Sequence, residues 1–162
     1  MMGGVRNWRA LSWFAVLSAV SGVLPAPRIH AQSVAEPLAT YAITADGIAE
    51  PLGGSKGDAE RGRKLAFDPE RGNCTICHPV PGGDARAQGD VGPTLAGVGA
   101  RLTQAQLRLR VVDGTRINPA TIMPPYHRIE GLNRVGPRWQ GKPVLAAQEV
   151  EDIVAFLATL RQ

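Results

Sequence analysis

Residues 74–78 read Cys-Thr-Ile-Cys-His, and this stretch decides what the rest of the chain must build. On a helical turn, side chains three and four positions apart lie on one face, so Cys74, Cys77 and His78 point to the same side. Two sulfurs and an imidazole in the order C-x-x-C-H form the attachment site of a c-type haem. The sulfurs form thioethers with the two vinyl groups, and the imidazole binds the iron. We therefore expect one covalent haem c on Cys74 and Cys77, with His78 as an axial ligand.

Three other kinds of site also use a pair of cysteines at this spacing. A thioredoxin-like redox pair requires a strand–helix–strand context, which this sequence lacks. A structural zinc site requires four ligands. Together with Cys74, Cys77 and His78, only His127 could provide the fourth zinc ligand. The side chains of Cys77 and His78, which are adjacent in the sequence, diverge too much to bind one zinc ion comfortably. A disulfide that closes so short a loop would stabilise little. All three fit the sequence less well than haem attachment.

The second axial ligand of the iron can be sought by elimination. Two of the three methionines stand at the start of the chain, so Met123 is the remaining thioether. It lies in an Ile-Met-Pro-Pro sequence, far enough from His78 to return over the opposite face of the haem, and the prolines fix its backbone. We therefore predict Met123 as the second axial ligand. The alternatives are that Met123 fills a gap in the core, or that the ligand is another side chain: His127, Lys64 or Lys142.

The loop after the motif offers a partner for the histidine. In Val-Gly-Pro-Thr-Leu, residues 91–95, Pro93 has no amide hydrogen but keeps a free carbonyl. We expect this carbonyl to accept a hydrogen bond from Nδ1 of His78, which would fix the orientation and the tautomer of the ring. Gly92 and Gly97 would let the loop lie close to the porphyrin.

The first 31 residues predict a secretory signal peptide. Arg6 and Arg9 precede an apolar run over 11–24, which is shorter than the about 20 residues that a bilayer span requires. We place cleavage after Ala31; an uncleaved membrane anchor is the alternative.

The chain after this point carries 15 basic and 14 acidic residues, so a nucleic-acid-binding surface is not expected. No other apolar run could span a membrane, so the mature protein is expected to be soluble and periplasmic.

Three short helices are expected in the mature chain. Asp58 can cap a helix over about 58–67, and Thr103 can cap another over about 104–112 that Gly114 closes. A third helix over about 147–160 has apolar residues on one face at helical spacing. No strand pattern is present, so the fold class is all-α.

Long stretches without periodicity separate these helices. Residues 32–56 are expected to form an extended N-terminal arm with turns at 46–47 and 53–54, followed by a domain over 57–162. Loops as long as 79–100 and 115–144 are uncommon in a compact domain unless something organises them. The mature chain has only five aromatic residues to build a core. A large apolar cofactor at the centre would meet both difficulties.

The combination of motifs resembles the class I cytochromes c. Gly-Asp-Ala-Glu-Arg-Gly-Arg-Lys at 57–64, the Cys-Thr-Ile-Cys-His motif, Gly-Pro-Thr-Leu-Ala-Gly-Val-Gly and the Met-Pro pair carry the resemblance, which covers roughly 57–162. The resemblance implies three to four short helices and long loops around one covalent haem. It also implies that the first and last helices cross with a small residue against an aromatic one, here Gly62 against Phe156.

A narrower resemblance covers residues 123–160, which are similar to the SoxX family of the thiosulfate-oxidising Sox system. The insert with Gly-Leu-Asn-Arg-Val-Gly and Trp-Gln-Gly-Lys-Pro-Val-Leu is not typical of generic small cytochromes c. Tyr126 and His127 depart from the pattern, because paired aromatic residues would be expected there. The resemblance implies a periplasmic heterodimer with a SoxA-type cytochrome, which joins thiosulfate oxidatively to a cysteine of a SoxYZ-type carrier and releases two electrons.

This resemblance implies that the chain is the non-catalytic electron-transfer subunit of an L-cysteine S-thiosulfotransferase. It would receive electrons from the partner subunit and pass them to a soluble cytochrome c. A stand-alone periplasmic electron shuttle is one alternative, and a haem enzyme with an open iron position is another. The insert over 128–142 is expected to contact the partner. A basic rim in the loops around Met123 would steer an acidic partner: Arg116, Arg128, Arg134, Arg138 and Lys142. The alternative is that one or two of these residues neutralise the haem propionates and the rest are solvated.

Overall fold

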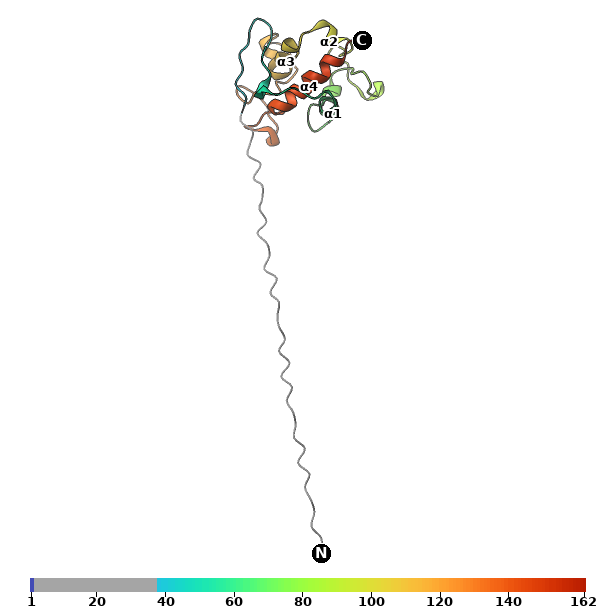
Figure 1. Ribbon diagram of the computed structural model, residues 1–162, viewed down its shortest axis with the longest axis vertical. Helices are drawn as coiled ribbons and strands as arrows, with labels where there is room; N and C mark the ends of the chain where they lie inside the picture. Colours follow the sequence, from blue (N-terminus) through green and yellow to red (C-terminus); the bar gives the residue numbers. More distant parts are fainter. Residues whose placement is uncertain (2–37) are drawn as a thin grey trace. The chain divides into compact units, whose positions relative to one another are not determined.

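The computed structural model describes residue 1 and residues 38–162, so the predicted signal peptide lies outside the described residues. Residues 38–162 belong to one compact unit. Figure 1 shows its helices gathered into a single body. The α-helices are α1 (Ala59–Phe67), α2 (Val98–Arg101), α3 (Gln104–Asp113) and α4 (Ala147–Thr159). The short 3-10 turns are η1 (Leu52–Gly54), η2 (Cys74–Ile76), η3 (Ala85–Ala87), η4 (Gly114–Arg116) and η5 (Pro137–Trp139). In the described part of the chain the only strand-like pairing is an isolated bridge between Thr44 and Gly47, which confirms the all-α class.

All three predicted helices form, and two of them begin at the predicted caps. The Asp58 side chain accepts a hydrogen bond from the amide of Arg61 at 2.8 Å, which satisfies one free donor at the start of α1. Thr103 and Gln106 form a reciprocal capping box at the start of α3. The short helix α2 lies in the stretch expected to be an irregular loop, because four residues are too few to give a periodic pattern.

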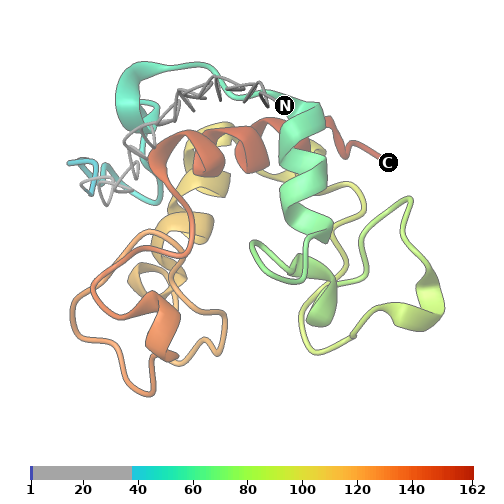
Figure 2. The ribbon, with the colours of Figure 1, turned by 90° about the horizontal axis from the view of Figure 1, so that it is seen from below.

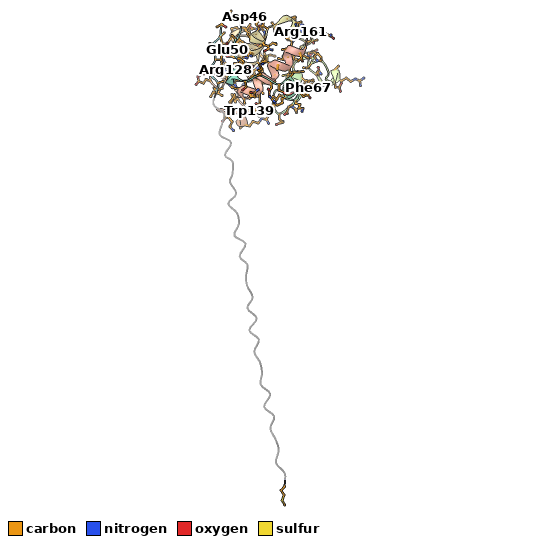
Figure 3. The ribbon with its side chains drawn as sticks, viewed as in Figure 1. Asp46, Glu50, Phe67, Arg128, Trp139 and Arg161 are labelled. Carbon is orange, nitrogen blue, oxygen red and sulfur yellow. The ribbon has the colours of Figure 1, made fainter. Side chains whose placement is uncertain are left out.

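The first and last helices cross at a glycine, as the resemblance implied. A side chain at Gly62 would overlap the backbone carbonyl of Asp152, so the two helices approach more closely than any other residue would allow. The three atoms nearest to a side chain at Gly62 belong to the backbone of Asp152 and Ile153. The ring of Phe156, the predicted aromatic partner, packs edge to face with the ring of Phe67, which is labelled in Figure 3, at 6.5 Å between centroids.

The described part of the N-terminal arm, residues 38–56, packs as part of this unit. Its turns lie where they were predicted, and Ile48 and Leu52 are buried. The guanidinium of Arg108 in α3 is also buried and donates at 2.7 Å to the carbonyl of Ile48 and at 2.7 and 2.8 Å to the carboxylate of Glu151. The same carboxylate accepts from the amide of Leu52 at 2.9 Å. One buried ion pair therefore fastens the arm to both α3 and α4.

Two sets of loops extend to the same side of the helical frame. Figure 2 shows α4 along the top, with α1 and the segment after it on one side, and α3 and the segment over 114–145 on the other. Over the described residues, no helix has both the length and the apolar character needed to cross a membrane.

Candidate haem site

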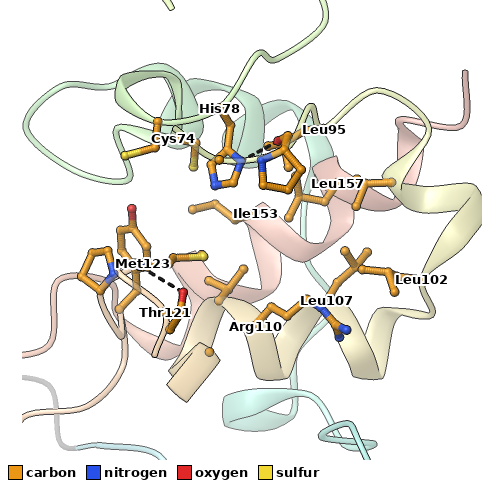
Figure 4. Close-up of a pocket in the computed structure, with 18 of the residues that line it drawn as sticks. Cys74, His78, Leu95, Leu102, Leu107, Arg110, Thr121, Met123, Ile153 and Leu157 are labelled. Atoms are coloured by element: carbon orange, nitrogen blue, oxygen red, sulfur yellow. Dashed lines mark hydrogen bonds between the residues drawn. The ribbon is translucent and has the colours of Figure 1, made fainter. Parts of the chain in front are cut away.

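A cavity of about 650 Å³ opens between these two sets of loops. Its walls come from the segment over 73–102, from α3 and the loop that follows it, and from two residues of α4 (Figure 4). Most of the residues that line it are apolar, including Leu95, Leu107, Val111, Ile153 and Leu157. A concave apolar space of this size is suited to a single large ligand.

The Cys-Thr-Ile-Cys-His segment forms one helical turn on a wall of the cavity. Asn73 has a left-handed conformation, with φ 45°, and begins the 3-10 turn η2. The amide of His78 donates to the carbonyl of Cys74 at 2.9 Å, so the motif closes a turn of helix. Cys74, Cys77 and His78 all line the cavity, which is the shared orientation that their spacing predicts.

A hydrogen bond to Pro93 orients the His78 ring. Nδ1 of His78 donates to the carbonyl of Pro93 at 2.7 Å, which leaves Nε2 free as a ligand atom. A methyl group at Gly92 would lie 2.5 Å from the same Nδ1, so this glycine is required by the imidazole itself. Gly97 has φ 67° and begins α2, where a left-handed conformation favours glycine.

Met123 lines the cavity from the loop that follows α3, opposite the wall that carries His78 (Figure 4). Its amide donates to Oγ1 of Thr121 at 3.2 Å. A thioether and an imidazole therefore face the same space from two separate segments. This arrangement can provide both axial ligands of one iron.

His127 has a different role from the one considered in the sequence. It is 2% exposed; its Nδ1 donates to the carbonyl of Leu145 at 2.8 Å, and its Nε2 accepts from the amide of Ala39 at 3.1 Å. Both ring nitrogens are occupied, so the alternative of His127 as an axial ligand is wrong. Lys64 and Lys142 do not line the cavity either.

Among the described residues, Arg101 and Arg110 are the only arginine or lysine side chains that line the cavity, and no carboxylate of this part of the chain accompanies them. Neither makes an ion pair within residues 38–162. Neither arginine was predicted from the sequence. A signal was present for Arg110, because it stands three positions after the apolar Leu107 and so lies on the same helical face.

The two thiols are not arranged for nucleophilic chemistry or for a zinc site. Burial raises the pKa of the Cys74 thiol to about 11, so it is protonated at neutral pH and is a poor nucleophile. Over the described range, no three His, Cys, Asp or Glu side chains are placed to share a metal ion. Burial also raises the pKa of the Tyr126 phenol well above its ordinary value.

The cavity fits a c-type haem in size and in chemistry. Apolar walls suit the faces of a porphyrin, and two sulfurs on one turn suit its two vinyl groups. An imidazole and a thioether from separate segments suit the iron. Two unpaired arginines, without a neighbouring acid in the lining, suit the two propionates.

Comparisons with known proteins agree with this arrangement. The sequence model of the family named Cytochrome c matches residues 59–161. A protein described as cytochrome c-553-like, from Synechocystis sp., is 31% identical over 105 residues, which make up 65% of this chain and 71% of that protein. The crystal structure of SoxXA from P. pantotrophus has a TM-score of 0.69 and 33% identity, covering 75% of this chain and 95% of the matched chain. The resemblance predicted from the motifs is thereby confirmed.

Proposed function

This chain belongs to the cytochrome c family, and from that premise we propose that it is the electron-transfer subunit of a SoxAX-type complex. The observation that carries the electron-transfer role is the cavity, where His78 and Met123 face the same apolar space from separate segments. When bound there, haem c supplies a reversible one-electron couple.

Each part of the cavity has a distinct task in holding this group. Cys74 and Cys77 would hold the group through thioethers, and His78 and Met123 would ligate its iron. Pro93 holds the imidazole in place through its carbonyl. Two guanidinium groups that line the cavity would neutralise the propionates: Arg101 and Arg110. With both ligands in place, the site would leave no position for a substrate, which suits a carrier of electrons.

The sulfur chemistry belongs to the partner in this proposal. A SoxA-type subunit would join thiosulfate to a cysteine of a SoxYZ-type carrier, a step that releases one proton and two electrons. The present chain would accept these electrons one at a time and pass them to a soluble cytochrome c. The likeness to a chain in a SoxXA crystal structure supports this role. We also propose export to the periplasm through residues 1–31.

A stand-alone periplasmic electron shuttle is the second candidate function. The 31% identity to a protein described as cytochrome c-553-like favours it. The two candidate functions differ in whether the chain needs a partner subunit. A stand-alone shuttle would work without one.

Three of the five residues of the predicted basic rim make ion pairs within the chain. Arg116 and Arg128 pair with the fully buried carboxylate of Asp113, at 3.3 and 3.1 Å. Arg138 pairs with Glu70, and its guanidinium lies 5.0 Å from the centroid of the Trp139 ring. These three arginines therefore have structural partners within the chain.

Arg134 and Lys142 are the two members of the rim that stay exposed and unpaired within the described residues. We propose that these two side chains of the 128–142 insert face the partner subunit. A charge contact of this kind acts mainly on the rate of association.

The experiment is to co-express the haem-loaded chain with a SoxA-type cytochrome and to purify the complex through an affinity tag on that partner. Thiosulfate and a SoxYZ-type carrier are then added. We expect a stable heterodimer whose haem is reduced by thiosulfate. Arg134→Ala with Lys142→Ala is expected to slow association, whereas Arg86→Ala with Lys64→Ala, which removes the same charge from two exposed positions outside the insert, serves as the charge-matched control. Recovery of the chain as a monomer, without thiosulfate-dependent reduction, would favour the stand-alone shuttle.

A further inference from the structure

Tyr126 connects the two walls of the cavity. Its hydroxyl donates to the carbonyl of Gly72 at 2.7 Å. Gly72 stands two residues before Cys74, and Tyr126 stands three residues after Met123. This hydrogen bond therefore joins the segment that carries the sulfurs and His78 to the loop that carries the thioether.

Both ends of this hydrogen bond are held rigidly. The amide of Tyr126 donates to the carbonyl of Val111 in α3 at 3.2 Å, and its carbonyl accepts from the amide of Leu145 at 3.0 Å. The amide of Gly72 donates to the carbonyl of Leu65 at 3.1 Å, at the end of α1. Because the backbones of Tyr126 and Gly72 are both held in place, the hydrogen bond of the phenol restrains the distance between the loop that carries Tyr126 and the segment that carries Gly72.

The link from Tyr126 to Met123 is also stiff. Pro124 and Pro125 separate the two residues, and each proline fixes one backbone dihedral angle. A displacement of Tyr126 away from Gly72 is therefore transmitted to Met123 rather than absorbed by the residues between them. Tyr126 and Met123 both line the cavity, so the residue that makes the hydrogen bond faces the same space as the proposed ligand.

A second polar contact joins the same two segments but lies on the surface. Arg138 pairs with Glu70, and their side chains are 56% and 70% exposed. Exposed ion pairs contribute little to stability, about 0–1 kcal/mol, because water and salt screen them. Arg71, next to Gly72, also lies 5.8 Å from the centroid of the Trp139 ring. Of the residues in these three contacts, only Tyr126 lines the cavity.

We propose that Tyr126 is a positioning residue whose hydroxyl holds the Met123 loop closed against the Cys-Thr-Ile-Cys-His segment, and so keeps Met123 on the iron. The inference rests on the proposed function, since it requires a haem with His78 and Met123 as ligands. Tyr126 acts through Met123 and does not itself ligate the iron.

The test compares Tyr126→Phe with Arg138→Gln in the full haem-loaded protein. Imidazole is titrated into the oxidised protein, and its displacement of Met123 is followed by the loss of the absorption band of the iron–thioether bond. One buried hydrogen bond is worth about a fivefold to tenfold change in an equilibrium constant. We expect Tyr126→Phe to bind imidazole about fivefold to tenfold more tightly than the wild type, and Arg138→Gln to match the wild type. Circular dichroism and covalent haem content are expected to be unchanged in both variants.

Two outcomes separate the failure of this inference from the failure of the proposed function. A Tyr126→Phe protein that binds imidazole within twofold of the wild type, while Met123→Ala binds it far more tightly, would overturn the role of Tyr126 alone. A wild-type protein without the iron–thioether band would overturn the assignment of Met123, and this inference with it.

A measurement on the wild type covers the case in which Tyr126→Phe does not fold. The loop is expected to open as one unit when the Tyr126 hydroxyl leaves Gly72. Hydrogen exchange at the Tyr126 amide should then report the same opening free energy as the saturating kinetics of imidazole binding. Two different opening free energies would overturn the proposal.

Discussion

Replacing Gly92 with Ala tests how the His78 ring is held. A methyl group at this position would lie 2.5 Å from Nδ1 of His78. Non-bonded heavy atoms of this kind settle at about 3.5 Å or more, so the ring and the loop must separate by about 1 Å. The loop is itself tied to the motif, because the amide of Gly92 donates to the carbonyl of Cys77 at 2.7 Å.

A separation of this size removes the hydrogen bond from His78 to Pro93. The bond measures 2.7 Å, and an N–H···O bond is lost beyond about 3.2 Å. Its net contribution is about 0.5–1.5 kcal/mol. A carbonyl that accepts from Nδ1 makes the imidazole a stronger electron donor and stabilises ferric iron. If the full contribution acts on the oxidised form, the reduction potential rises by about 20–60 mV, at about 59 mV for each tenfold change.

The assay is a redox titration of the haem-loaded protein, combined with denaturant unfolding. Gly136→Ala is the matched control, because a methyl group at Gly136 has no atom within 4 Å and its φ is −58°. We expect Gly92→Ala to raise the potential and lower the unfolding midpoint, and Gly136→Ala to change neither. Equal potentials and equal midpoints in the two variants would show that the His78–Pro93 bond does not depend on the space at Gly92.

Two further predictions concern α4. Arg108→Met leaves the buried carboxylate of Glu151, whose side chain is 3% exposed, without its cation, so we expect the unfolding free energy in guanidinium to fall by about 3–5 kcal/mol. A double variant with Glu151→Leu that is no more stable than this single variant would contradict the reasoning. Burial raises the pKa of Asp152, but hydrogen bonds from Arg61 and other donors lower it by more, so it lies below the ordinary value. The resulting stability is present above the pKa of the unfolded chain and is lost as the pH falls through the folded value. Asp152→Asn should therefore unfold more easily than the wild type at neutral pH and match it in strong acid; a gap that does not change with pH would exclude the ionised carboxylate as the cause.

The helices could be predicted from the sequence because their signals are local. Asp58 and Thr103 cap the helices that they precede, and the periodic apolar face of α4 identifies it without any tertiary information. The short helix α2 has no such pattern, since Val98–Arg101 completes little more than one turn. The close crossing at Gly62 was predicted, but the atoms it meets depend on the angle between two helices far apart in the sequence.

The residues of the candidate site also fall into two groups: those that local sequence predicts and those that depend on contacts between distant segments. Cys74, Cys77 and His78 are neighbours along the chain, so their spacing is enough to predict their common orientation. The hydroxyl of Tyr126 meets Gly72 across 54 positions, and no local pattern contains that pairing. The same limit applies to His127, whose partner Ala39 belongs to the arm, 88 positions away.

The position of Met123 follows from how α3 ends. The last carbonyls of an α-helix have no partner within the helix, and a buried carbonyl must find a donor elsewhere. In α3 these carbonyls include Val111 and Val112, which accept from the amides of Tyr126 and His127 at 3.2 Å each. The loop is therefore drawn back to the helix end three residues after Met123. Because two stiff prolines fill that interval, satisfying the end of α3 also determines where the thioether enters the cavity.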